Sequence, residues 1–159
     1  EGRIMKTTKI CVTTEDFDAG EEIRLAAARS PAAGGIASFV GVVRNRNDGE
    51  AVSAMSLEHY PGMTEKALAE IVEKARSRWP LEDVTVIHRV GDLKLGDQIV
   101  LCLVCAEHRR EAFEACEFIM DWLKTEAPFW KKETTPSGAR WVDARESDEA
   151  AKARWTNGL

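Results

Sequence analysis

The chain has 159 residues, of which 44% are hydrophobic and 31% are charged, a balance typical of a soluble globular protein. Its formal net charge of −5 argues against a general nucleic-acid binder, because such proteins normally carry a basic surface. No apolar run approaches the ~20 residues that a membrane-spanning helix needs, and no signal peptide is recognisable. Residues 1–4, which precede Met5, are interpreted as a vector-derived remnant, and residues 5–159 are expected to form one domain.

Patterns of hydrophobicity and turn residues predict an α+β fold with a mainly antiparallel sheet and packed helices. Strands are predicted over residues 6–13, 36–43, 52–59, 84–90, 98–106 and 140–144. Helices are predicted over residues 19–28, 64–78 and 110–126. Asp18 is a candidate N-cap for the first helix, and Pro80 ends the second.

The connections between these elements carry turn signals. Residues 44–49 end in Asp-Gly, so the strands on either side are expected to pair as a hairpin. Residues 91–97 and 134–138 are expected to be connections without strands of their own. The charged tail from Arg145 has no predicted element.

Four cysteines raise a redox or metal-binding interpretation, and Cys102 and Cys105 form a C-x-x-C pattern. That pattern lies inside the apolar run 98–106, which predicts a buried strand. Residues three apart on a strand point to opposite faces, so the two thiols would not converge. We therefore expect Cys11, Cys102, Cys105 and Cys116 to be structural and reduced, which favours a cytoplasmic location.

The long helix over 110–126 carries two apolar surfaces. On a helical wheel one broad arc holds Ala112, Phe113, Cys116, Ile119, Met120 and Leu123. Lys124 falls at the edge of this arc, which predicts partial burial. Phe118 and Trp122 form a second strip, so the helix is expected to be covered by its own sheet and by another subunit.

The stretch from Asp121 to Glu133 joins this helix to a predicted strand, with Pro128 at the junction. Lys124 lies in the last helical turn, and Lys131 follows the proline beside two aromatic residues. Lysines beside large apolar side chains are candidate nucleophiles, acids or bases, because desolvation disfavours the ammonium form. The alternative is that both lysines only cover apolar surface with their aliphatic stems.

Basic residues follow two apolar strands, where small-molecule sites tend to form. Arg44 and Arg46 leave one strand, while His108, Arg109 and Arg110 open the long helix. A helix N-terminus of this kind can bind phosphate, although a solvated basic turn explains the pattern equally well. No nucleotide-binding, metalloprotease or Ser-His-Asp signature is present. His59 and His88 are interpreted as strand residues with local hydrogen bonds, and no metal site is predicted.

Five short blocks occur in order: Phe39–Asn45, Leu57–Lys66, Val86–Gly91, Ala106–Arg110 and Lys124–Glu133. Each block alone is weakly specific, but five in register are highly specific. Together they resemble the large, catalytic subunit of molybdopterin synthase, over nearly the whole chain from Lys9 to Trp155.

The resemblance implies an α/β hammerhead-type fold and a central homodimer, with a small subunit at each end of a heterotetramer. It implies a sulfurtransferase of molybdenum-cofactor biosynthesis. The sulfur donor would be the thiocarboxylated C-terminal glycine of a small ubiquitin-like partner. The acceptor would be cyclic pyranopterin monophosphate, which becomes the dithiolene of molybdopterin. No cofactor or metal is implied for this subunit.

Carried over by motif, the resemblance makes Lys124 and Lys131 the catalytic candidates. The candidates for substrate binding are Val42, Val43, Arg44, His108, Arg109, Lys132 and Glu133. Many relatives have lysine where this chain has Val42, so that position departs from the family pattern. Whether Lys124 is a transient nucleophile or a charge stabiliser, and whether Lys131 is a general acid or base, stays open at this point.

Two other functions are compatible with the same residues. The chain could be a non-catalytic receptor for a ubiquitin-like tail, or a lysine-dependent enzyme acting on another phosphorylated metabolite. The resemblance favours catalysis in a homodimer. We expect His108 and Arg109 of one protomer to complete the pocket that contains Lys124 and Lys131 of the other.

Overall fold

The computed structural model describes residues 6–47, 50–142 and 146–157; residues 1–4, interpreted above as a vector remnant, lie outside this range. The strands in the described part are β1 Thr7–Thr13, β2 Gly35–Val42, β3 Arg46–Asn47, β4 Glu50–Ala51, β5 Ala54–His59, β6 Leu81–Arg89, β7 Gly91–Lys94, β8 Gln98–Ala106, β9 Phe129–Thr135 and β10 Gly138–Val142. The helices are α1 Ala19–Arg29, α2 Met63–Arg78, α3 Arg109–Glu126 and α4 Glu146–Asn157. None of these helices is long and apolar enough to cross a membrane.

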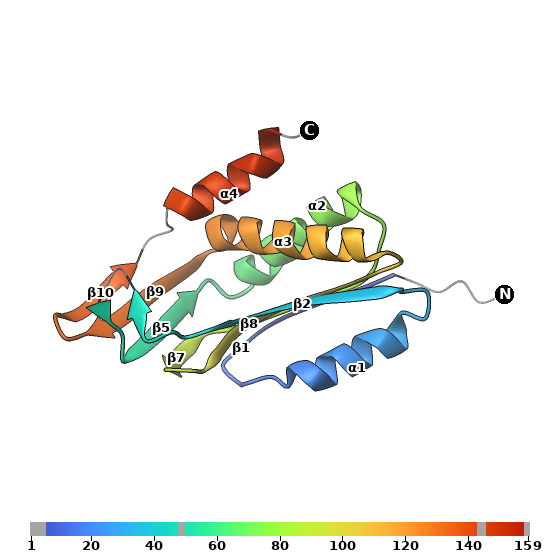
Figure 1. Cartoon of the computed structure of the whole chain (residues 1–159). Helices are drawn as coiled ribbons and strands as arrows, with labels where there is room; N and C mark the ends of the chain where they lie inside the picture. Colours follow the sequence, from blue (N-terminus) through green and yellow to red (C-terminus); the bar gives the residue numbers. More distant parts are fainter. Residues whose placement is uncertain (1–5, 48–49, 143–145, 158–159) are drawn as a thin grey trace.

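The larger sheet has the strand order β1-β6-β8-β2. β1 runs parallel to β6, while the β6–β8 and β8–β2 pairs are antiparallel. Helices α2 and α3 cover one face of this sheet and α1 covers the other (Figure 1). The predicted α+β class with a mainly antiparallel sheet is therefore confirmed.

Strand β8 lies at the centre of the core and is buried on both faces. Cys102 packs in the cluster beneath α2 and α3, whereas Cys105 packs in the cluster beside α1. All four cysteines are free thiols. Because the two thiols of the C-x-x-C pattern point to opposite sides of the sheet, the prediction that they do not converge is confirmed.

A second, smaller sheet with the order β10-β9-β5-β7 extends from one end of the larger sheet (Figure 1). The predicted hairpin between strands 36–43 and 52–59 is wrong, because β2 pairs with β8 while β5 pairs with β7 and β9. Strand β2 carries apolar residues on both faces and joins a sheet covered on both sides. Strand β5 alternates and needs only one covered face.

The Asp-Gly signal lies at residues 48–49, outside the described residues, between the short paired strands β3 and β4. Residues 91–94, expected to be part of a connection, form β7 at the edge of the smaller sheet. The expected loop 134–138 is a shorter turn, because β9 continues to Thr135 and β10 begins at Gly138. Gly138 has a positive φ of 110°, which suits this tight connection.

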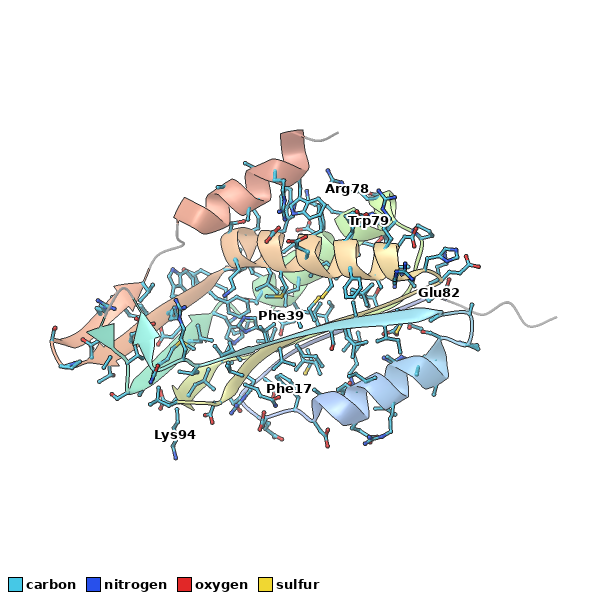
Figure 2. The ribbon with its side chains drawn as sticks, in the orientation of Figure 1. Phe17, Phe39, Arg78, Trp79, Glu82 and Lys94 are labelled. Carbon is cyan, nitrogen blue, oxygen red and sulfur yellow. The ribbon has the colours of Figure 1, made fainter. Side chains whose placement is uncertain are left out.

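The tail forms a helix, α4, which the sequence pattern did not predict. Its Trp155 meets Phe118 of α3 with ring centroids 5.5 Å apart, and the indole N–H donates to Asp121 at 2.6 Å. Trp79, the C-cap residue of α2, lies beside Arg78 in Figure 2 and completes the cluster, with its ring centroid 5.4 Å from that of Phe118. Phe118 is only 2% exposed, so α2 and α4 cover this strip rather than another subunit.

The helical wheel misplaced Phe113. Its side chain is 66% exposed, although the wheel assigned it to the arc facing the core. Phe113 is therefore an apolar residue on the surface of α3. The edge strand β2 also exposes apolar residues, namely Ile36, Phe39 and Val42.

The opposite face of the larger sheet is anchored by an ion pair. The guanidinium of Arg29, the last residue of α1, bonds to the buried carboxylate of Asp83 on β6 with an Nε–Oδ1 distance of 3.0 Å. The hydroxyls of Thr7 and Thr85 donate to the same carboxylate. A fully buried carboxylate needs this number of partners to offset its desolvation.

We predict that Arg29→Met lowers the free energy of unfolding by about 3 kcal/mol, because it leaves the Asp83 charge buried without its cation. The matched control is Arg24→Met, whose exposed partner on the same helix is Glu21; this variant should leave the unfolding free energy unchanged. Urea denaturation of both variants checks the prediction, and equal stabilities would contradict it.

Candidate functional site

The two candidate lysines are separated by one change of direction in the backbone. Helix α3 ends at Glu126, and its C-cap Ala127 is already extended, with ψ of 137°, before Pro128. Strand β9 begins at the next residue. Lys124 thus lies in the last turn of α3 and Lys131 is the third residue of β9, as the sequence predicted.

Alternation along β9 divides the candidate residues between two faces. Lys131 and Glu133 share the inner face, where their Nζ and Oε2 atoms are 3.8 Å apart. Glu133 is only 4% exposed. Its Oε1 also accepts a hydrogen bond from Nη2 of Arg140 on β10, at 3.4 Å. Lys132 leaves on the outer face, where its Nζ lies 5.6 Å from the ring centroid of Trp141. The structure therefore brings Glu133 to Lys131 and places Lys132 on the other side of the sheet.

Lys124 lies over the end of the larger sheet. Its side chain is exposed in the isolated chain, whereas the helical wheel predicted partial burial. Its ammonium group acts on His88 of β6, because the positive charge of Lys124 helps to lower the pKa of that histidine. His88 is in register with Val100 of β8, which pairs with Gly41 of β2, so Lys124 stands over the end of the sheet at which β2 finishes.

The sequence analysis assigned no functional role to His88, although the structure places it in this site. Its ring stacks on Phe129 with centroids 3.8 Å apart and an interplanar angle of 16°. Its Nδ1 lies 2.9 Å from the carbonyl oxygen of Arg89, the local hydrogen bond that was expected. Burial, followed by the positive charge of Lys124, lowers the pKa of His88 to about 4, so the ring is neutral at physiological pH.

The candidates after β2 lie at the same end of the sheet as His88. Val43, expected to be in the strand, follows it; its N–H donates to the Asp97 carbonyl at 2.9 Å and its side chain is buried. Val42, the position expected to depart from the family pattern, is 50% exposed and faces solvent. Arg44 is exposed immediately beyond.

His108 and Arg109 lie far from this group. His108 is the N-cap of α3 and Arg109 is its first residue, and both are exposed. Since Lys124 is fifteen residues further along the same helix, about 22 Å of helix axis separate Arg109 from Lys124. A single chain therefore does not bring His108 and Arg109 to the lysines.

The lysine end of the chain supplies positive charge and proton donors around a neutral aromatic floor. Lys124 and Lys131 provide two ammonium groups, and the second of them pairs with Glu133, which also accepts a hydrogen bond from Arg140. Such a group suits a reaction in which negative charge develops on an oxygen or sulfur atom. In the part of the chain that the structure describes, no cluster of three or more His, Cys, Asp or Glu side chains is arranged to hold a metal ion.

The buried His88 predicts acid-dependent stability. Its pKa is about 4 in the folded chain and about 6.5 when unfolded, so between these values the unfolded chain binds a proton that the folded chain does not. The free energy of unfolding should fall as the pH falls from 6.5 to 4, by on the order of 3 kcal/mol from this group. Urea denaturation across this range should show a shallower dependence for His88→Phe, and identical slopes would contradict the assignment.

Comparison with known proteins agrees with this geometry. The model of the MoaE protein family matches residues 12–126. The chain is 64% identical over 146 residues to the molybdopterin synthase catalytic subunit of Ralstonia nicotianae, covering 92% of this chain and 83% of that protein. It is 59% identical over 151 residues to the molybdopterin synthase catalytic subunit of Escherichia coli, covering 95% of this chain and all of that protein.

Among solved structures, the molybdopterin biosynthesis MoaE protein from Burkholderia ambifaria superposes with a TM-score of 0.81 at 56% identity, covering 94% of this chain and 98% of that one. The resemblance read from the five sequence blocks is thereby confirmed. The chain belongs to the MoaE family and is a molybdopterin synthase catalytic subunit, a sulfurtransferase of molybdenum-cofactor biosynthesis.

Proposed function

We propose that this subunit transfers sulfur from the thiocarboxylated C-terminal glycine of a small ubiquitin-like partner to cyclic pyranopterin monophosphate. Two such transfers produce the dithiolene of molybdopterin. The observation that carries the proposal is the pair of lysines, Lys124 and Lys131, held on either side of Pro128 at one end of the sheet. The family name of the relatives, a catalytic subunit, supports both the chemistry and the need for a further chain.

The two lysines have different surroundings and therefore suit different tasks. Lys124 is exposed at a helix end and can reach a bound tail, as a transient nucleophile that accepts the acyl group or as a cation that stabilises negative charge. Lys131 is ion-paired with the buried Glu133, which orients its ammonium group. That fixed orientation suits a general acid or base. In each transfer the thiocarboxylate sulfur forms a carbon–sulfur bond to the pterin and displaces an oxygen substituent there. Water then cleaves the bond between the sulfur and the acyl carbon, so the sulfur stays on the pterin as a thiol and the acyl carbon becomes a carboxylate.

The remaining substrate-binding candidates differ in charge and position, and we assign them different roles. Arg44, beyond the end of β2, can bind the anionic phosphate, and Val42 and Val43 form the wall beside it. Glu133 acts through Lys131, because a carboxylate would repel an anionic substrate. Lys132 contributes to the same pocket only if the substrate or the tail extends to the outer face of β9.

A homodimer would complete the site. Strand β2 is at an edge of the larger sheet and exposes Phe39 and Val42, and α3, which packs on the same sheet, exposes Phe113. An unpaired apolar edge of this length favours pairing with a second chain. The commonest such pairing is a two-fold axis, which sets two β2 strands antiparallel.

That arrangement would bring the distant basic residues to the lysines. The start of β2 lies against Arg109, because a Cβ on Gly35 would be 3.3 Å from the Arg109 Cα. The end of β2, about 23 Å away, lies near Lys124. In an antiparallel pair the start of one strand faces the end of the other. His108 and Arg109 of one protomer would thus stand beside Lys124 and Lys131 of its partner.

We place the protein in the cytoplasm. The four cysteines are free, and Cys102 and Cys105 lie in the core on opposite sides of the sheet. A reducing compartment keeps such thiols unpaired.

Reconstitution tests the function and the lysines together. With the thiocarboxylated partner and the cyclic pterin, we predict that the protein forms dithiolene product and that Lys124→Ala lowers single-turnover rates by about 100-fold or more. Lys131→Ala should be impaired less severely. The control is Lys66→Ala on the exposed side of α2, which should keep the original rate.

Two results would contradict this assignment. Absence of product, where another molybdopterin synthase turns over, would exclude the enzymatic function and favour a receptor for a ubiquitin-like tail. Near-normal rates in both lysine variants would show instead that the lysines only cover apolar surface.

The shared pocket is tested by complementation. We predict that mixing a Lys124→Ala chain with an Arg109→Ala chain restores activity, because each heterodimer then contains one intact pocket. The recovered fraction should follow subunit exchange, measured by native mass spectrometry. A monomer in sedimentation, or full exchange without recovery, would show that the pocket is not shared.

A further inference from the structure

Three aromatic rings lie close together next to Pro128, where the backbone changes direction between the two lysines. Phe129, the first residue of β9, stacks on His88 of β6 with a centroid separation of 3.8 Å. His59 of β5 is the partner of Phe129 in the strand register, and the centroids of their two rings are 6.4 Å apart. The three rings come from three different strands and join the end of the larger sheet to the smaller one.

This ring cluster lies at a critical place in the chain. Phe129 directly follows Pro128, lies five residues after Lys124 and two before Lys131, and shares the inner face of β9 with Lys131. A shift of Phe129 would therefore move the start of β9 and change the separation of the two lysines. Displacement of a reacting group by about 1 Å can cost about 100-fold in rate.

We propose that His59 and His88 are positioning residues for sulfur transfer, and that their contacts with Phe129 fix Lys131 relative to Lys124. The inference rests on the proposed function of the two lysines. It goes beyond that function by assigning a role to two histidines that do not need to touch the substrate.

Two further observations favour positioning over a purely stabilising role. Among the described residues the buried Nδ1 of His59 has no hydrogen-bond partner, which a side chain selected for stability alone would avoid. His88 is buried close to Lys124, and its low pKa keeps it neutral. A neutral ring can stack flat on Phe129, whereas a charged one would add a second cation beneath Lys124.

The test compares ring-deleting and ring-keeping variants in the reconstituted synthase. At saturating substrate, His88→Ala should lower the single-turnover rate by about 10-fold or more, with apparent substrate affinity changed by less than about threefold. His88→Phe keeps a ring against Phe129 and should recover most of that loss. Phe129→Leu should resemble His88→Ala and serves in its place if that variant does not fold.

The matched control is Phe118→Leu, the same substitution in an aromatic cluster between α2, α3 and α4, away from the lysines. It should lose stability but keep its rate. A readout independent of turnover is the relative modification of Lys124 and Lys131 by a limiting amine-reactive reagent, followed by mass spectrometry. The ratio should change in His88→Ala and Phe129→Leu, return in His88→Phe, and stay constant in Phe118→Leu.

The outcomes separate the two proposals. If folded His88→Ala and Phe129→Leu keep both the original rate and the original modification ratio, the positioning role is excluded. If Phe118→Leu lowers the rate as much as Phe129→Leu does, general destabilisation explains the loss and the positioning role is again excluded. If Lys124→Ala and Lys131→Ala stay active, the catalytic role proposed for the two lysines fails, while the modification ratio still shows whether the rings position them.

Discussion

The burial of β8 on both faces is the constraint on which the rest of the structure depends. Nine residues with almost no polar side chains must be covered by apolar layers above and below and by strands at both edges. Helix α1 supplies one layer, and α2 and α3 supply the other. Because α3 is about 27 Å long and runs along a sheet of similar length, its two ends necessarily serve opposite ends of the molecule.

This geometry explains the distribution of basic residues. The N-terminal end of α3 carries His108 and Arg109, and its C-terminal end carries Lys124. Neither group can move toward the other without dismantling the core. Strand β2 runs along α3 and has an exposed apolar edge. Pairing of two such edges across a two-fold axis would bring the basic residues of one protomer to the lysine of the other. In the proposed homodimer, assembly and catalysis would therefore depend on the same strand.

The change of direction at Pro128 has a different consequence. It ends α3 and starts a strand of the smaller sheet, so one short segment ties the two sheets together and carries both lysines. Alternation along β9 then selects which side chains meet. Lys131 turns inward to Glu133, while Lys132 turns outward to Trp141. The neutral His88 beneath Phe129 provides an uncharged floor, so positive charge is concentrated on the lysines.

Local sequence patterns identified most elements, because hydrophobic period, caps and proline breaks act over a few residues. They placed α1 with its Asp18 cap, α2, β8 and α3, and they separated Lys124 from Lys131 by a helix end. The opposed positions of Cys102 and Cys105 followed from strand alternation alone. The sequence blocks also identified the family.

Only the tertiary structure decided which strands pair, because register depends on burial over the whole sheet and not on the nearest turn. For that reason β2 joined β8 instead of β5. The same reason applies to Phe118, covered by an unpredicted α4, and to Phe113, left exposed at the edge of the helix-covered face. His88 lies 36 residues before Lys124, and no spacing rule connects them. Lys124 influences the pKa of His88 because β6 and α3 both finish at the same end of one sheet, which is a property of the packed layers and not of any segment by itself.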